Sequence, residues 1–236
     1  MTMEVLQDKL QIKKARKELI NKGVSFIDSS LQAFLRKLRI LRKIEIGDMV
    51  KSWDVLATIN FLNDAVSKEE PILDVGCYAS ELIIALNKLG YTNLTGADLN
   101  QNIHCMPYQE SIKYVINDFM RTKFQDASFR AITSISVIEH GFDGKKLLKE
   151  TSRLLMTNGY FIASFDYWPT KIDTSNIKHF GMEWKIFSKD EVVDFITEAA
   201  SYGLFPVGEL KYDGKHETIF CATKHYTFAW LVLKKK

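Results

Sequence analysis

Residues 71–100, PILDVGCYASELIIALNKLGYTNLTGADLN, decide the fold of this chain. The stretch begins with an apolar run over 72–73 that ends on Asp74-Val75-Gly76 and continues with a helix-period segment over 82–89. A second short run over 92–97 then ends on Asp98. This order predicts a strand, a tight turn, a helix and a second strand. The two strands should be parallel, because the helix returns the chain to the same edge of the sheet. The stretch therefore predicts an α/β fold.

The turn after the first strand is suited to a nucleoside. Gly76 lets the backbone approach a ligand closely, and the following helix presents unpaired N–H groups at its start. Asp98 ends the second strand, where a carboxylate can accept hydrogen bonds from both hydroxyls of a ribose. A dinucleotide fingerprint requires G-x-G-x-x-G, whereas this turn has one glycine. Asp74 would also repel a pyrophosphate, while it suits a cationic ligand.

These residues resemble the first motif of the class I S-adenosylmethionine-dependent methyltransferases, L-D-x-G-x-G-x-G. Leu73, Asp74 and Gly76 match the motif, and Tyr78 and Ser80 stand where it has its second and third glycines. The resemblance implies a Rossmann-like, seven-stranded, mostly parallel sheet with helices on both faces. It also implies S-adenosyl-L-methionine as cofactor and methyl transfer as the reaction.

Two later stretches are similar to the same family. A third strand is expected to end at Asn117-Asp118-Phe119, where the family has an acid for the adenine amino group and an apolar neighbour for the ring; the alternative is a polar strand end and a core phenylalanine. The S-x-x-E-H sequence over 136–140 resembles the fourth-strand signature of small-molecule members. Open α/β sheets bind ligands at the carboxyl ends of their strands. The resemblance thus implies these cofactor-binding residues: Asp74, Gly76, Cys77, Tyr78, Asp98, Leu99, Asp118, Phe119 and Ser136.

The sequence offers three polar residues for catalysis. The sulfonium carries its own activation, so a methyltransferase mainly aligns the reactants and excludes water. A hydroxyl acceptor also needs a base. We expect that base to be His140, then His179, then Asp166, although each could have a structural or positioning role. No metal site is indicated, because the three cysteines show no C-x-x-C spacing.

Residues 1–66 are expected to form a helical extension or cap before a cofactor-binding domain at 67–236. The extension could cover its own site or pair with a second copy in a homodimer. Lys51 could reach the carboxylate of a bound cofactor, or simply be solvated. An apolar stripe recurs at helical spacing at Leu31, Phe34, Leu35, Leu38 and Leu41. The basic residues on another face form a solvated surface or an anion-recruiting lid for a phosphate-bearing substrate or a membrane: Arg36, Arg39 and Lys43.

The rest of the chain alternates helices and strands. Residues 145–156 should be helical and 160–165 a fifth strand, followed by a long connection over 170–187 that we expect to face the substrate. A capping box at 188–191 opens a further helix. Two strands over 205–212 and 226–233 should complete the sheet.

Composition describes an ordinary globular protein of 236 residues with 46% hydrophobic and 26% charged residues, enough for one core and an appended element. The net charge of +3 is too small to indicate nucleic acid as a partner. The longest apolar runs are too short to cross a bilayer, and the cysteines suggest no disulfide framework. We therefore expect a cytoplasmic protein, with contact to a membrane surface as a variant.

The last fifty or so residues are loosely similar to bacterial methyltransferases associated with surface-polysaccharide synthesis, notably over 184–188 and 226–230. This similarity favours an O-methyltransferase acting on a sugar or glycolipid intermediate. Two other classes remain open. One is a non-catalytic methyltransferase-like binding subunit, in which Tyr78 and Ser80 crowd the pocket. The other is an NAD-dependent oxidoreductase, against which Asp74 argues.

Overall fold

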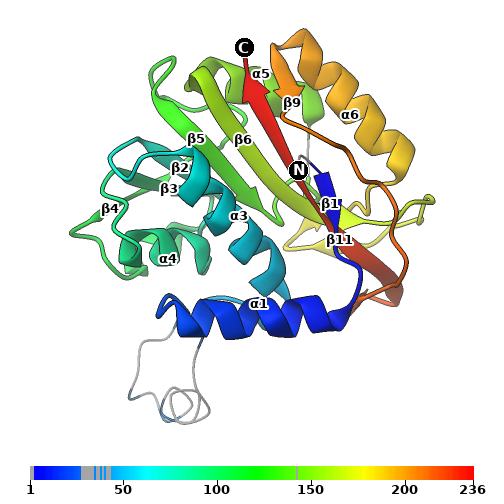
Figure 1. Cartoon of the computed structure of the whole chain (residues 1–236), viewed down its shortest axis with the longest axis horizontal. Helices are drawn as coiled ribbons and strands as arrows, with labels where there is room; N and C mark the ends of the chain where they lie inside the picture. Colours follow the sequence, from blue (N-terminus) through cyan, green and yellow to red (C-terminus); the bar gives the residue numbers. More distant parts are fainter. Residues whose placement is uncertain (1–2, 28–34, 36–37, 39, 41–43, 142) are drawn as a thin grey trace.

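A sheet of nine strands forms the centre of the protein (Figure 1). The computed structural model describes residues 3–27, 35, 38, 40, 44–141 and 143–236. The strands are β1 (Met3–Val5), β2 (Ile72–Val75), β3 (Leu94–Asp98), β4 (Ile112–Ile116), β5 (Phe129–Ile135), β6 (Leu155–Tyr167), β9 (Leu204–Pro206), β10 (Ile219–Cys221) and β11 (Lys224–Lys235). The main path is β1-β11-β6-β5-β2-β3-β4, and β9 and β10 also pair with β11.

The inner strands of this path are parallel, as the sequence predicts. β2 pairs in parallel with β3 on one side and with β5 on the other, and β4 and β6 extend the two halves. β11 runs antiparallel to β6. The chain therefore changes direction across the sheet between β2 and β5. At such a switch point, the crevice beyond the carboxyl ends of the strands is where α/β sheets bind ligands.

Helices cover both faces of the sheet (Figure 1). They are α1 (Lys9–Asn21), α3 (Ser52–Ala65), α4 (Leu82–Lys88), α5 (Gly144–Leu154) and α6 (Lys189–Ser201), with short 3₁₀ turns η1 (Met49–Lys51) and η2 (Gln101–Cys105). Successive strand residues point to opposite faces. Ile72 thus packs in the core with α1, α3 and α4, whereas Leu73 packs in the core with α5 and α6.

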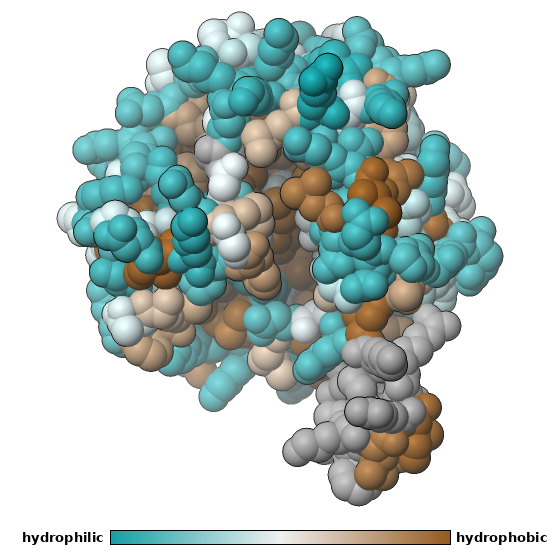
Figure 2. Space-filling model, turned by 180° about the vertical axis from the view of Figure 1, so that it is seen from behind, coloured by the Kyte–Doolittle hydropathy of each residue, from teal (hydrophilic) through white to brown (hydrophobic). Residues whose placement is uncertain are grey.

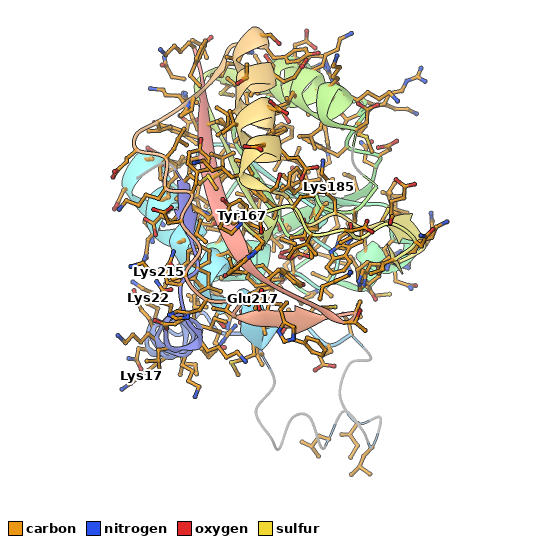
Figure 3. All side chains as sticks on the ribbon, turned by 90° about the vertical axis from the view of Figure 1, so that its right-hand side faces the viewer. Lys17, Lys22, Tyr167, Lys185, Lys215 and Glu217 are labelled. Atoms are coloured by element: carbon orange, nitrogen blue, oxygen red, sulfur yellow. The ribbon has the colours of Figure 1, made fainter. Side chains whose placement is uncertain are left out.

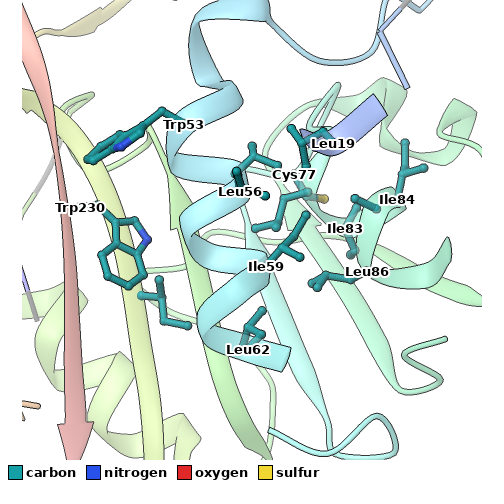
Figure 4. Close-up of a cluster of buried hydrophobic side chains, with 14 of the residues drawn as sticks. Leu19, Trp53, Leu56, Ile59, Leu62, Cys77, Ile83, Ile84, Leu86 and Trp230 are labelled. Atoms are coloured by element: carbon teal, nitrogen blue, oxygen red, sulfur yellow. The ribbon is translucent and has the colours of Figure 1, made fainter. Parts of the chain in front are cut away.

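α3 is the helix that joins the sheet to the N-terminal segment. Its Leu56 and Ile59 lie on the side of α4, and Trp53 lies on the side of Trp230 in β11 (Figure 4). Trp230 Nε1 also donates a hydrogen bond of 2.9 Å to the Thr58 hydroxyl. A side chain as fully buried as Ile59 contributes about 1.5–3 kcal/mol. α3 is therefore fixed where its first turn reaches the carboxyl ends of the strands.

The N-terminal segment differs in part from the helical extension predicted over residues 1–66. Met3–Val5 form a strand, β1, that pairs antiparallel with β11. Three residues are too few to show a period, and the exposed edge of β11 determines their conformation. α1 follows, with Asp8 and Gln11 forming a capping box. The remaining features predicted there, at Leu31, Phe34, Arg36, Arg39, Leu41 and Lys43, lie outside the described residues.

The C-terminal part confirms the helix but not the lengths of the strands. The capping box of Ser188 and Glu191 opens α6 as predicted. The strand expected over 205–212 is only β9, and the connection between the two final predicted strands contains β10. The long connection over 170–187 carries a small hairpin, β7 (Lys178–His179) and β8 (Met182–Glu183). No helix in the described part of the chain is long and apolar enough to cross a membrane.

Candidate active site

The turn after β2 packs directly against the segment after β5. Gly76 has φ +69°, and a Cβ at this position would lie only 2.3 Å from Val137 Cγ2. The Gly76 N–H donates to the Ala97 carbonyl at 2.8 Å. Both the conformation and the close contact require glycine. The turn is therefore held at the switch point between β2 and β5.

Asp98 connects this turn to the end of β3. Its carboxylate accepts hydrogen bonds from the N–H groups of Tyr78 at 2.9 Å and Asn100 at 2.8 Å. Leu99, beside it, is mostly exposed. Cys77 is different, because its thiol is buried against Gly96 and burial raises its pKa. Only the backbone of Cys77 is therefore placed to contact a ligand.

Asp74 is a buried carboxylate with unused hydrogen-bonding capacity. Oδ1 accepts a hydrogen bond of 2.7 Å from the Thr133 hydroxyl, and the Ser80 hydroxyl lies near enough to the carboxylate to lower its pKa, whereas Oδ2 has no hydrogen-bond partner among the described residues. Burial raises the pKa of Asp74 to about 7. A buried, unpaired carboxylate oxygen is costly, and a donor or a cation nearby would offset that cost.

The two residues expected at the adenine ring have different environments. Asp118 follows β4 and is exposed, with Oδ1 accepting a hydrogen bond of 2.9 Å from the Met120 N–H. Phe119 is only 7% exposed and packs in the core with Val75 and Ala97. This burial favours the core interpretation of Phe119 over a stacking role.

The N-terminal segment is bonded to the same turn. Arg16 of α1 donates to both carboxylate oxygens of Glu81 at 2.8 Å, and both side chains are buried. The Gly47 N–H donates to the Ala79 carbonyl at 2.8 Å. Lys17, the next residue of α1, extends away from the sheet (Figure 3). The segment before β2 therefore contacts the turn through a buried ion pair and a backbone hydrogen bond.

Ser136 connects the end of β5 to Lys51. It has φ +53°, a costly conformation for serine, and its N–H donates to the Ser164 carbonyl at 3.0 Å. The Ser136 hydroxyl accepts a hydrogen bond from Lys51 Nζ. That ammonium group also lies 3.5 Å from the centre of the Phe228 ring. Lys51 is therefore placed against the strand ends rather than in solvent.

Glu139 is the main residue of this region that the sequence did not single out. Its side chain is 1% exposed and lies near Asp166 and Lys51, with a hydrogen bond from the Ser136 hydroxyl. Oε2 has no hydrogen-bond partner among the described residues. Burial, and then the neighbouring Asp166, raise the pKa of Glu139 well above its ordinary value. The available signal was a carboxylate between Ile138 and His140, directly after a buried strand.

Asp166 is a second buried carboxylate, at the end of β6. Its Oδ2 accepts a hydrogen bond of 2.7 Å from Trp184 Nε1, and the Tyr226 hydroxyl also donates to it. Burial raises its pKa. Behind it, Asp54 Oδ2 accepts a hydrogen bond of 2.7 Å from the Ser164 hydroxyl, and burial raises the pKa of Asp54 to about 6.

The structure brings the three predicted catalytic residues together. The His140 and His179 rings are 5.9 Å apart, and the His179 ring lies 4.6 Å from the ring of Trp184, which is bonded to Asp166. Burial lowers the pKa of His140 to about 4, helped by His179 and Lys51, so its imidazole is neutral at pH 7. A neutral imidazole can accept a proton.

A hollow opens on the face of the molecule opposite to that of Figure 1 (Figure 2). Hydrophobic side chains line its walls, and hydrophilic side chains surround the opening (Figure 2). Phe180, at the tip of the β7–β8 hairpin, is 87% exposed and has its ring 5.5 Å from that of His140. The hairpin therefore presents an apolar side chain beside the predicted base.

The fold is shared with several solved structures at low sequence identity. Geranyl diphosphate C-methyltransferase from Streptomyces coelicolor A3(2) has a TM-score of 0.58 and 15% identity, over 76% of this chain and 78% of that chain. The 1,6-didemethyltoxoflavin-N1-methyltransferase of Burkholderia thailandensis has a TM-score of 0.56 and 14% identity, over 78% of each chain. The [4+2]-cyclase SpnF has a TM-score of 0.53 and 12% identity, over 80% of this chain and 84% of that chain. These likenesses establish the architecture.

The sequence itself identifies the domain. Residues 73–163 match the family described as the methyltransferase domain, which spans β2 to β6 and includes both the turn at Gly76 and the segment after β5. No curated protein matches the sequence. Residues 73–163 of the chain therefore match a methyltransferase domain, on a fold that solved methyltransferases share.

Proposed function

We propose that the enzyme transfers a methyl group from S-adenosyl-L-methionine to a hydroxyl group of a small molecule, a sugar or glycolipid intermediate. The observation that carries this proposal is the contact between Gly76 and Val137. Because of this contact, the turn at Gly76, which we propose as the nucleoside-binding turn, lies beside the segment that bears His140. Cofactor and acceptor would therefore meet at one edge of the sheet.

The residues of the turn fit the cofactor. Asp98 would accept hydrogen bonds from the ribose, and the exposed carboxylate of Asp118 would accept one from the adenine amino group. Gly76 allows the backbone to approach the cofactor closely. Asp74 Oδ2, which has no hydrogen-bond partner among the described residues, could accept a hydrogen bond from a cationic group of the cofactor. When bound, the cofactor supplies the activated methyl group.

The acceptor side of the site contributes a base and its support. His140, neutral at pH 7, would take the hydroxyl proton as the bond to carbon forms. His179 and Asp166 would position it through the Trp184 ring. Two of the named neighbours are a C-methyltransferase and an N1-methyltransferase, so the choice of oxygen rests on this base and on the loosely similar C-terminal sequence.

The proposal also covers where the enzyme works. The cysteines are free thiols, which suits the cytoplasm. An acceptor with a lipid anchor would bring the enzyme to an anionic membrane surface. The exposed lysines that could make that contact are on or next to α1: Lys9, Lys13, Lys14, Lys17 and Lys22.

Isothermal titration with S-adenosylmethionine and S-adenosylhomocysteine tests the proposal. We expect micromolar binding of both, lost in Asp98→Ala and kept in Asp64→Ala, which removes an exposed carboxylate of α3. Mass spectrometry of sugar and glycolipid acceptors would then identify the methylated atom. Failure of both ligands to bind would favour the alternative, a non-catalytic binding subunit whose pocket Tyr78 and Ser80 close.

A further inference from the structure

A cluster of buried acidic and aromatic groups, called the acidic chamber below, lies beyond the carboxyl ends of β5 and β6. We define it by two buried carboxylates and the groups around them: Glu139, Asp166, Lys51, Trp184, Tyr226 and Phe228. Five separate parts of the chain contribute, namely η1, the segment after β5, the end of β6, the segment at 184, and β11. The chamber adjoins His140 and so lies on the acceptor side of the proposed reaction.

The hydrogen bonds of the chamber are incomplete at one place. Asp166 receives two donors, from Trp184 and Tyr226. Glu139 receives the Ser136 hydroxyl, but its Oε2 has no hydrogen-bond partner among the described residues, at 1% exposure. Buried polar atoms are almost always paired, by protein, water or ligand. Glu139 Oε2 is therefore the position where a donor is missing.

The charges of the chamber define that donor. Two carboxylates face one lysine, and the Lys51 ammonium is already engaged by the Ser136 hydroxyl and the Phe228 ring. An anionic group would be repelled by both acids. An ammonium group would donate to Oε2 and would favour the charged form of Glu139, and the rings of Trp184 and Tyr226 suit a cation.

We propose that the methyl acceptor carries an ammonium group, and that Glu139 binds it through Oε2. The inference rests on the proposed function, and it narrows the substrate to an amino sugar or an amino-sugar glycolipid. Glu139 then selects the substrate, while His140 accepts the hydroxyl proton. An ammonium group beside Glu139 also stabilises the carboxylate form, so binding releases a proton.

The test is isothermal titration of the protein saturated with S-adenosylhomocysteine. The probes are glucosamine, galactosamine and mannosamine, each against its N-acetyl counterpart and against glucose at equal ionic strength. We expect at least one amino sugar to bind tenfold or more tightly than its N-acetyl form. Titration in two buffers with different ionisation enthalpies should show proton release. Burial and the neighbouring Asp166 raise the pKa of Glu139 in the free protein, against the opposing effect of Lys51, and a bound ammonium group would lower that pKa again. The Tyr226 hydroxyl is the other titratable group that faces Glu139.

Two variants decide which group is responsible. Glu139→Gln keeps the shape and should lose the tenfold preference and the proton release, while it binds S-adenosylhomocysteine like the wild type. Asp54→Asn removes another buried carboxylate near Lys51, which accepts a hydrogen bond from Ser164 outside the chamber. This variant should keep both the tenfold preference and the proton release.

Three results would overturn the proposal. They are equal affinity for the amino and N-acetyl sugars, absence of binding by all three amino sugars, and an unchanged preference in Glu139→Gln. A protein that binds no S-adenosylhomocysteine would instead refute the proposed function. The same sugar titrations on that protein would still decide whether Glu139 recognises an ammonium group.

Discussion

Replacing Arg16 with methionine removes the positive partner of a buried ion pair, and we expect it to destabilise the protein by about 3–5 kcal/mol. The Arg16 guanidinium donates to both oxygens of Glu81 at 2.8 Å and to the Ser52 hydroxyl at 2.9 Å. In the variant, Glu81 retains the Phe26 N–H but remains a carboxylate with 2% of its side chain exposed. The expected loss is mainly the cost of leaving that charge unpaired.

The assay is the free energy of unfolding from urea titrations followed by tryptophan fluorescence. Lys22→Met is the matched control, because it breaks a pair with Glu18 at 3.4 Å whose side chains are 36% and 47% exposed. The control should cost less than about 0.5 kcal/mol. The double variant Arg16→Met/Glu81→Gln should recover part of the loss, since glutamine leaves no unpaired charge. A loss below about 1 kcal/mol for Arg16→Met would refute the reasoning.

Three further predictions concern the site. His140→Ala should lower single-turnover methyl transfer more than tenfold with cofactor affinity near wild type in titration; unchanged turnover would remove His140 as the base. Gly76→Ala should weaken S-adenosylhomocysteine binding at least tenfold, because the new Cβ would meet Val137 at 2.3 Å, and full affinity in calorimetry would contradict this contact. Asp54→Asn should stabilise the protein by up to about 3 kcal/mol at pH 8 and by almost nothing at pH 4. In the folded wild type the pKa of Asp54 is about 6, above its ordinary value of 3.8. The stability of the wild type therefore falls as the pH rises from about 3.8 to about 6, because the buried carboxyl loses its proton later than in the unfolded chain. Urea unfolding of both proteins at pH 4–8 measures this difference, and parallel curves would disprove the assignment.

The sequence predicted the parallel core because its signals are local. The strands at 72–75 and 94–98 and the turn at Gly76 follow from hydrophobic runs and one glycine within 30 residues. The position of β1 could not be predicted in this way, since it depends on an unpaired edge of β11 more than 220 residues later in the chain. Edge strands are specified by their partner rather than by their own pattern.

The site shows the same division. A carboxylate at a strand end, such as Asp98, could be recognised because the position alone suggests its role. The importance of Glu139 depends on which groups surround it, and these come from residues 51, 166 and 226. Sequence reasoning locates strand ends but does not tell which of the adjacent side chains are buried without a partner. The hydrogen bond from Trp184 to Asp166 could not be predicted for the same reason, because Trp184 lies in a long connection that shows no hydrophobic periodicity.

The N-terminal segment links the two halves of the site. Arg16 fixes α1 to Glu81 beside the turn at Gly76 that we propose holds the cofactor (the cofactor turn), and Ser52, which accepts a hydrogen bond from Arg16, directly follows Lys51. Lys51 in turn contacts Ser136 at the acidic chamber. A shift of this segment would therefore move a residue of the chamber and loosen the cofactor turn together. Arg16→Met should accordingly weaken both S-adenosylhomocysteine and amino-sugar binding, whereas Glu139→Gln should weaken only the second. Selective loss of one ligand in Arg16→Met, measured by titration under conditions where the variant is folded, would show that the two halves are independent.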